Sequence, residues 1–281
     1  MKQKFSNRLR VCLLLLGGGI MLYPLLWMLG ATFMTNAELF GSFSPIPLHP
    51  TLDGYRLAME EYGGAINLLG AMKNTILLVL SKVLFTLISC TLTAYGFARF
   101  EFCGKRILFA LLISTLFLPQ SVMYVPQFLM FSELGWVDSP FYPALVLPSL
   151  FAFDTYFIFM LIQHFKSTPR ELDDAAKIDG CNAVQTLFHV LCPVIRPALI
   201  SCALLQFIWS SNDYMGPLLY VSTPELYPLS LFVKLSMDAD AGAAWNRILA
   251  VSLISVLPTL MLFFSAQKFF VEDITAGSLK S

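Results

Sequence analysis

The 281-residue sequence has few charged side chains and no excess of either sign. Lys and Arg number 18, Asp and Glu number 18, and charged residues make up only 13% of the chain, whereas a soluble domain carries about 25%. Hydrophobic residues make up 57%, and the mean hydropathy is +0.71. The balanced charge gives no basis for nucleic-acid binding, and the composition indicates a protein whose solvent is mostly lipid.

The residues that build disulfides, metal centres and nucleotide sites are scarce or poorly placed. The six cysteines form no C-x-x-C pair and the three histidines share no ligand spacing, so we expect neither a disulfide nor a metal site. No G-x-x-x-x-G-K-[ST] motif occurs, so a P-loop for ATP is absent. The dispersed histidines also give no catalytic constellation, so we expect a chain that is not an enzyme and binds no cofactor itself.

Six apolar segments are each long enough to cross a bilayer, which takes about 20 helical residues. They lie at about 10–34, 74–98, 107–131, 142–165, 184–210 and 247–271. No repeat, low-complexity run or long linker divides the chain. We therefore expect an all-α membrane protein in which residues 1–281 form a single transmembrane domain with a core at 70–271.

Positive side chains are unequally distributed between the segments that flank these spans. Twelve Lys and Arg residues fall at the N-terminus, in the loops after the second and fourth spans, and in the C-terminal tail. The segments 35–73, 132–141 and 211–246 hold three. The positive-inside rule therefore places both termini in the cytoplasm. The two longer external segments are rich in Pro and Gly, which predicts interruptions of regular structure there.

The stretch from Thr168 to Gly180 predicts a short polar helix between two apolar spans. Thr168 suits the N-cap, Pro169 suits the first helical position, and Glu171 can complete a capping box. Gly180 suits the left-handed conformation that ends a helix. These start and stop signals predict a rigid element of about ten residues.

One face of this predicted helix is small and mostly apolar. At helical spacing it consists of Leu172, Ala175, Ala176 and Asp179. A helix that rests on the membrane interface would instead carry bulky apolar residues and a basic polar face. The alanines and the net acidic charge favour contact with a partner protein.

Together with Pro193 and Pro197, this stretch resembles the cytoplasmic coupling loop of permease subunits in binding-protein-dependent ABC importers, written EAA, a few residues, then G. Further similarity extends over most of residues 70–281, including Ala-Tyr-Gly-Phe-Ala-Arg at 94–99 and Thr-Ala-Gly-Ser-Leu-Lys at 275–280. Within that superfamily the chain looks like a carbohydrate-uptake permease of the maltose type.

The resemblance implies a type I ABC importer permease fold, with six transmembrane helices and a cytoplasmic coupling helix between the fourth and fifth. It implies a multi-pass protein of the bacterial cytoplasmic (inner) membrane that imports an oligosaccharide, a sugar or a related polyol. The implied partners are a second, similar permease, two ATPase subunits that use ATP and Mg, and an external solute-binding protein.

The resemblance also implies which residues couple to the ATPase. They are Glu171, Asp174, Ala175, Ala176, Asp179, Gly180, Pro193 and Pro197. The sequence departs from the family pattern at Asp174, where Glu is usual. The charge is kept, but the side chain is one methylene shorter.

Two ionisable residues lie inside predicted spans, where a charge usually faces a cavity or a partner. Lys82 is in the second span and Asp154 is near the middle of the fourth. A mutual ion pair, a role in the translocation pathway, and snorkelling of Lys82 to the interface all remain open. Asp154 alone gives little support to the alternative function, an ion-coupled secondary transporter of a polar solute, which would need several intramembrane carboxylates and inverted repeats.

A second group of pathway candidates lies at the end of the fifth span. It consists of Trp209, Asn212, Asp213 and Tyr214, where aromatic rings stand beside hydrogen-bonding groups suited to a sugar. An interfacial aromatic belt at the end of a span is the alternative interpretation.

Overall fold

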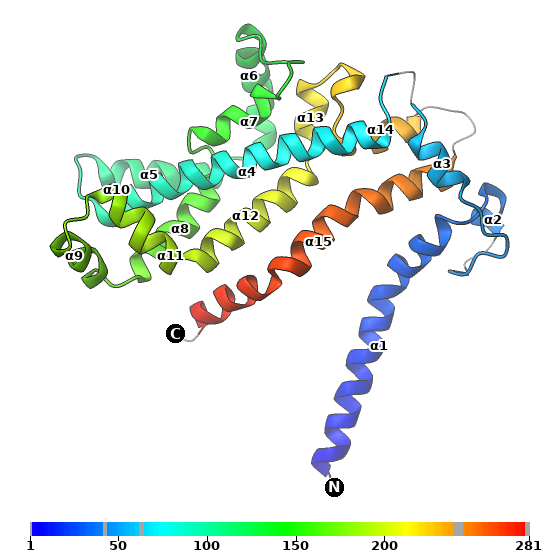
Figure 1. Ribbon diagram of the computed structural model, residues 1–281, viewed down its shortest axis with the longest axis horizontal. Helices are drawn as coiled ribbons and strands as arrows, with labels where there is room; N and C mark the ends of the chain where they lie inside the picture. Colours follow the sequence, from blue (N-terminus) through cyan, green and yellow to red (C-terminus); the bar gives the residue numbers. More distant parts are fainter. Residues whose placement is uncertain (1, 42–43, 62–64, 239–243, 279–281) are drawn as a thin grey trace. The chain divides into compact units, whose positions relative to one another are not determined.

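The computed structural model is built of helices joined by loops, with no β-strand among the residues it describes (Figure 1). It describes residues 2–41, 44–61, 65–238 and 244–278. The chain divides into two compact units. The smaller comprises Met1–Gly70 and Phe232–Leu257, and the larger comprises Ala71–Leu231 and Pro258–Ser281.

In chain order the α-helices are α1 (Lys2–Ala31), α2 (Asn36–Gly41), α3 (Asp53–Met59), α4 (Leu68–Arg99), α5 (Lys105–Thr115), α6 (Gln120–Glu133), α7 (Pro143–Leu150), α8 (Thr155–Ser167), α9 (Glu171–Ile178), α10 (Ala183–Gln185), α11 (Cys192–Val194), α12 (Arg196–Ser211), α13 (Met215–Tyr220), α14 (Leu229–Asp238) and α15 (Trp245–Ser278). A π-helix occupies Thr186–Leu191, and a 3₁₀ turn occupies Pro224–Leu226.

The smaller unit is held together by close backbone packing around α3. A Cβ on Gly54 would come within 2.6 Å of the Asn246 carbonyl oxygen, so only glycine lets α3 lie this close to the start of α15. The hydroxyl groups of Tyr55 and Thr32 are 2.8 Å apart and share a hydrogen bond.

The larger unit has a core in which α8 packs between α4 and α12. Phe157, Leu161 and Phe165, at helical spacing on α8, are fully buried. They meet small side chains, among them Ala94 of α4 and Ala198 of α12. Small residues at such contacts let helices approach closely, as is common in membrane bundles.

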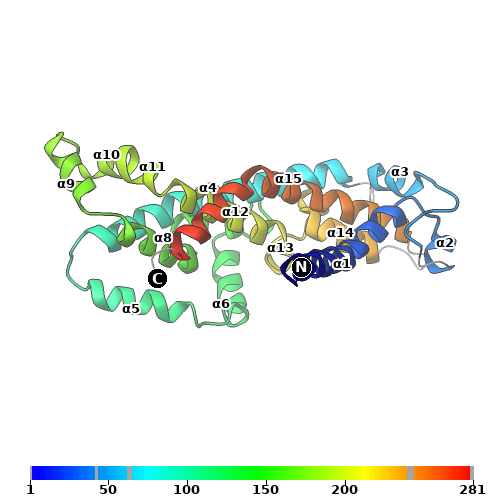
Figure 2. The ribbon, with the colours of Figure 1, turned by 90° about the horizontal axis from the view of Figure 1, so that it is seen from below.

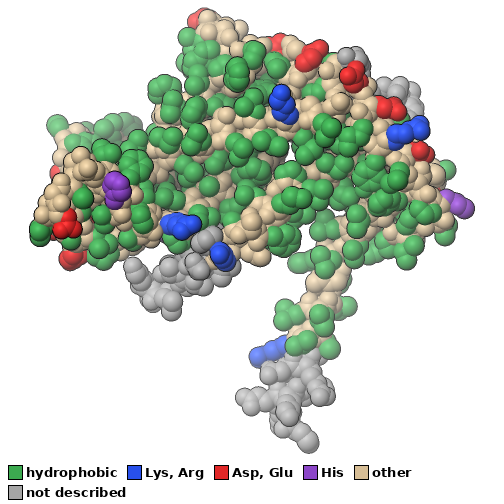
Figure 3. All heavy atoms as spheres, viewed as in Figure 1, with side chains coloured by type: hydrophobic (Ala, Val, Ile, Leu, Met, Phe, Trp, Pro, Cys, Tyr) green, Lys and Arg blue, Asp and Glu red, His purple; other side chains and the backbone are tan. Residues whose placement is uncertain are grey.

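Four helical segments are long and apolar enough to cross a membrane by themselves. They are Arg10–Ala31, Leu68–Arg99, Pro143–Ser167 and Trp245–Lys268. Hydrophobic side chains are spread widely over the visible face (Figure 3). Two further pairs of helices pass the same test only together, so the described residues hold four to six spans. The expected count of six therefore depends on whether each pair is one span.

The third and fifth spans are each broken into two helical parts. Between α5 and α6 the axis turns by 104°, and between Ala183–Val194 and α12 it turns by 82° (Figures 1 and 2). Pro119 has an extended backbone before α6, which ends the helical run. At the second bend, Pro197 has no N–H to donate to the carbonyl of Pro193 four residues earlier.

The two longer segments between spans contain more helix than their Pro and Gly content predicts. Residues 35–73 include α2 and α3, and residues 211–246 include α13 and α14. Their prolines lie mostly before or between these helices: Pro224 begins the short 3₁₀ turn, and Pro228 directly precedes α14. Proline here separates short helices without preventing them.

Candidate functional site

The helix α9 forms where the sequence predicts a polar helix, but it begins differently. It runs from Glu171 to Ile178, and Arg170 at its N-cap makes no capping hydrogen bond through its side chain. Thr168 instead ends α8, because its hydroxyl and its N–H both donate to the His164 carbonyl oxygen, at 3.0 and 3.2 Å. The expected capping box between Thr168 and Glu171 is therefore not formed.

The end of α9 is confirmed as the sequence predicts. Gly180 has φ +83°, the left-handed conformation that favours glycine. The Cys181 N–H donates to the Ala176 carbonyl at 2.9 Å, and the Gly180 N–H donates to that of Lys177 at 3.0 Å. These two bonds make a Schellman motif, which fixes where α9 stops.

The predicted small face of α9 is divided between the inside and the outside of the molecule. Ala176 is only 3% exposed, contrary to the expectation that it faces a partner, and α9 packs against the π-helix that follows. The exposed residues of α9 are Glu171, Asp174, Ala175, Lys177 and Ile178, and Asp179 after its end is exposed too. Acidic side chains accordingly appear at the edge of the surface that α9 occupies (Figure 3).

Ile178 is a residue of this surface that the sequence reasoning missed. Its side chain is 87% exposed at the last position of α9. It lies three residues after Ala175 and four after Asp174, so helical spacing places all three on one exposed surface. An apolar side chain displayed beside carboxylates is a feature that a partner protein could cover.

The Asp174 carboxylate is available at this surface. It forms an ion pair with Lys177 at 3.3 Å, and both side chains are 70% exposed. Such an exposed pair contributes at most about 1 kcal/mol, so either group can exchange it for a partner's charge. Pro193 and Pro197 lie farther along the chain, on either side of the bend at Ile195.

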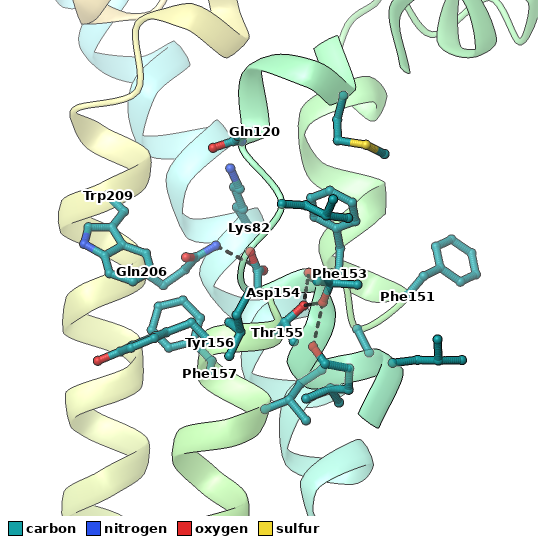
Figure 4. A pocket seen from close by; sticks show the side chains of 18 of the residues that line it. Lys82, Gln120, Phe151, Phe153, Asp154, Thr155, Tyr156, Phe157, Gln206 and Trp209 are labelled. Carbon is teal, nitrogen blue, oxygen red and sulfur yellow. Dashed lines mark hydrogen bonds between the residues drawn. The ribbon is translucent and has the colours of Figure 1, made fainter. Parts of the chain in front are cut away.

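A cavity of about 920 Å³ lies within the larger unit, lined from α4, α5, α6, α8 and α12 and from the α7–α8 connection (Figure 4). Its polar side chains include Lys82, Gln120, Asp154 and Gln206. Its aromatic lining includes Phe151, Phe153, Tyr156, Phe157 and Trp209. The cavity thus joins residues from five helices, which no local sequence motif brings together.

Asp154 lies at the break between α7 and α8, where it holds a small hydrogen-bonded network. Its carboxylate accepts a hydrogen bond from the Thr86 hydroxyl at 2.6 Å and one from the Gln206 amide at 3.4 Å. The same amide donates to the Thr86 hydroxyl oxygen at 3.0 Å. Ala152, just before, has φ +59°, so the chain turns sharply here and directs residue 154 at α4 and α12.

The possible ion pair between Lys82 and Asp154 is not formed. Both side chains are in the described part of the chain and line the cavity, but no ion pair joins them. Figure 4 shows the Lys82 amine turned away from the Asp154 carboxylate. Hydrogen bonds from Thr86 and Gln206 take the place of the lysine, and both were missed because each is an ordinary polar residue in an apolar span.

The four candidates at the end of α12 are separated by the structure. Trp209 lines the cavity and packs on the rings of Tyr156 and Phe157, with centroids 5.2 and 5.0 Å away. Asp213 also lines the cavity, and its carboxylate accepts a hydrogen bond from the Gly216 N–H at 3.0 Å.

Asn212 and Tyr214 are not part of the cavity lining. Tyr214 packs instead against the core around α7 and α13. Within the described residues, no group of three or more His, Cys, Asp or Glu side chains is placed to hold a metal ion, and all six cysteines are free.

Comparison with known proteins gives consistent matches along most of the chain. Residues 79–275 match the family described as "Binding-protein-dependent transport system inner membrane component". A trehalose/maltose transport system permease protein from Thermococcus litoralis is 29% identical, covering 97% of this chain and 98% of the relative. A galactooligosaccharides transport system permease protein from Bacillus subtilis is 30% identical, covering 93% and 91%.

A solved structure shares the fold. One chain of a bacterial ABC transporter involved in the import of the acidic polysaccharide alginate superposes with a TM-score of 0.83 at 21% identity, covering 96% of this chain and 98% of that one. The all-helical architecture is therefore that of a type I ABC importer permease, a multi-pass membrane protein. The chain belongs to the family of inner membrane components of binding-protein-dependent transport systems.

Proposed function

We propose that this chain forms half of the translocation pathway of an ATP-driven importer for a carbohydrate, meaning an oligosaccharide, a sugar or a related polyol. The relatives named for trehalose/maltose and for galactooligosaccharides support this class of solute. The family membership also argues against the alternative, an ion-coupled secondary transporter, because its members depend on a binding protein.

The observation that carries the substrate class is the lining of the 920 Å³ cavity. Tyr156 and Trp209 offer ring faces on which the C–H face of a sugar can pack. Lys82, Asp154 and Gln206 offer donors and acceptors for hydroxyl groups. A pocket with apolar walls and a few polar groups is typical of a site for a small polar molecule.

The energy would come from a separate chain that holds ATP and Mg. The exposed surface of α9, which includes Asp174, Ala175 and Ile178, would dock on this ATPase. A second, similar permease would complete the pathway. Two ATPase subunits would bind on the cytoplasmic side, and an external binding protein would deliver the solute. With six spans and both termini in the cytoplasm, as we propose, α9 would lie on the same side of the membrane as the ATPase.

Reconstitution tests this function directly. The permease pair, its ATPase and its binding protein are purified together and placed in liposomes, with ATP on the side of the ATPase. We expect uptake of at least one radiolabelled oligosaccharide from a panel that includes maltose-type and galactose-type sugars, and no uptake without ATP. ATP-independent uptake driven by an ion gradient would instead support a secondary transporter.

Substitution of Trp209 tests the role of the cavity. Its side chain is 48% exposed, so Trp209→Ala should leave the amount of folded complex nearly unchanged. The loss of a stacking surface worth about 1 kcal/mol should lower the maximal uptake rate several-fold, while Trp209→Phe should retain most of it. Equal uptake by wild type and Trp209→Ala would show that the solute does not contact this ring.

A further inference from the structure

A buried ion pair joins α9 to the end of α4. The Nε of Arg99 lies 3.1 Å from Oδ2 of Asp173, and the side chains are 6% and 12% exposed. The Nε–H does not point at this oxygen, so the contact is an ion pair without a hydrogen bond. The Nη2 of Arg99 donates a hydrogen bond to the Thr168 carbonyl oxygen at 3.0 Å. The last residue of α4 thus holds both α9 and the segment before it.

A second contact from α4 holds the segment after α9. Tyr95 lies one helical turn before Arg99, and its hydroxyl donates to the Ala183 carbonyl oxygen at 3.2 Å. Its ring packs on those of Phe100 and Phe165, with centroids 5.2 and 5.7 Å away. The last turns of α4 therefore hold the chain on both sides of α9.

The helix α4 leads from this attachment to the cavity without a break. It is continuous from Leu68 to Arg99 and contains no proline, whereas the α5–α6 and α10–α12 segments are bent. Thr86, thirteen residues before Arg99, lies about 20 Å along the helix axis. Its hydroxyl binds Asp154, from which α8 runs back to Thr168. Both ends of α8 are thus joined to α4, at Arg99 beside α9 and at Thr86 beside the cavity.

We propose that Arg99 and Asp173 are positioning residues that make α9 move as one body with α4 and α8, so that a displacement of α9 by the ATPase reaches the cavity. This inference rests on the function proposed above. The exposed pair of Asp174 and Lys177 can exchange with solvent or a partner at little cost. The pair of Arg99 and Asp173 cannot, because loss of either partner leaves the other charge buried and unpaired.

The test compares variants of the full complex in liposomes. Asp173→Asn leaves Arg99 without its counter-charge, and Arg99→Lys keeps the positive charge but loses the fork that reaches both Asp173 and Thr168. The double variant Arg99→Gln with Asp173→Asn removes both charges, so it avoids an unpaired buried ion. Glu101→Gln is the matched control. Glu101 lies in the loop directly after α4, and the substitution removes its ion pair with Lys105, in which Nζ and Oε1 are 2.9 Å apart.

The first measurement is the number of ATP molecules hydrolysed per solute imported, at equal amounts of assembled complex. We expect this ratio to rise at least fivefold in Asp173→Asn and in the double variant, less in Arg99→Lys, and not at all in Glu101→Gln. A lower yield of complex with an unchanged ratio would show that the pair only stabilises the fold, and it would overturn the inference.

The second measurement is amide hydrogen exchange of α9 in the same complexes, which needs no solute. We expect exchange in residues 174–180 to be about tenfold faster in the double variant than in wild type, with α8 and the Glu101→Gln control unchanged. Unchanged exchange in α9 would overturn the inference even if the complex transports no sugar. If the wild-type complex imports no sugar, that result counts against the proposed function. The exchange measurement would still decide whether the ion pair of Arg99 and Asp173 holds α9.

Discussion

Asp138, in the loop between α6 and α7, joins two loops of the larger unit. Its carboxylate accepts hydrogen bonds from the Thr223 hydroxyl at 2.6 Å and from the N–H groups of Thr223 and Ser222 at 2.8 and 2.9 Å. The hydroxyl bond of Thr223 is the largest cause that lowers the pKa of Asp138 to about 2. Asp138 also has φ +54°, which Asp and Asn tolerate better than most residues.

Asp138→Asn therefore removes the negative charge, while the new residue still tolerates the positive φ at this position. The pKa of Asp138 is lower in the folded protein than the value of about 3.9 for an unfolded chain, so its contribution to stability is present above about pH 4 and is lost as the pH falls toward 2. Because the group is partly exposed, we expect the variant to be less stable at pH 7 by no more than about 1 kcal/mol.

Thermal unfolding of the purified chain in detergent at pH 7 and pH 3 measures this difference. The difference in stability between wild type and Asp138→Asn should be smaller at pH 3 than at pH 7. At pH 3 the carboxyl of Asp138 binds a proton more readily in the unfolded state than in the folded one. A difference of the same size at both pH values would show that the charge of Asp138 is not what stabilises the two loops.

At the scale of elements, α9 shows how far local sequence determines local structure. Its end could be predicted, because Gly180 supplies the left-handed conformation within the same few residues. Its start could not, because Thr168 has two possible bonding partners, the N-terminus of α9 and the last carbonyls of α8. The structure uses the second, and nothing in the sequence ranks them. The burial of Asp173 likewise depends on Arg99, which is distant in the sequence. The burial of Ala176 depends on how α9 packs, and α9 packs against an irregular element, the π-helix.

The spans illustrate the same division between local and distant effects. The hydropathy of each apolar segment predicts where membrane helices lie, and both the third and the fifth segment contain prolines. Whether a proline bends a helix slightly or turns it by 82° to 104° depends on which neighbours satisfy the freed carbonyls, and the sequence does not give those neighbours. The cavity depends on these bends, so only its individual candidates Lys82, Asp154, Trp209 and Asp213 could be named beforehand.

Gly180→Val tests the importance of the end of α9. A β-branched residue at φ +83° costs about 1–2 kcal/mol, and no neighbour lies close enough to add a clash. We expect normal membrane levels but a clear loss of uptake, because α9 would end in a different direction. Gly104→Val is the matched control: Gly104 has φ +80° and equally open surroundings, but it precedes α5. An equal loss in both variants would indicate general destabilisation and not a role of α9.

At the scale of the whole molecule, the distribution of Lys and Arg predicts which loops face the cytoplasm. Cys103 and Cys181 lie in loops expected inside, and Arg56, whose side chain is 77% exposed, lies in a segment expected outside. In single-cysteine variants, a membrane-impermeant thiol reagent added to intact cells should label Arg56→Cys, and should label residues 103 and 181 only after the membrane is opened. Labelling of Cys103 in intact cells would reverse this topology.

The absence of a P-loop predicts a division of labour between chains. The purified chain alone should neither hydrolyse ATP nor bind it specifically, while the complete complex should hydrolyse ATP faster when the binding protein carries its solute. Tight nucleotide binding by the isolated chain would require a site that the sequence does not reveal.

The proposed function requires that α9 docks on a separate ATPase, and cross-linking from position 178 detects that contact. A photo-reactive amino acid replaces Ile178, which is 87% exposed, and irradiation of the membranes is followed by identification of the adducts. We predict one major adduct with the ATPase and none from a probe that replaces Phe141, which is 73% exposed in the loop before α7 on the opposite side of the proposed topology. An ATPase adduct from position 141, or no ATPase adduct from position 178 in a complex that transports, would contradict the claim.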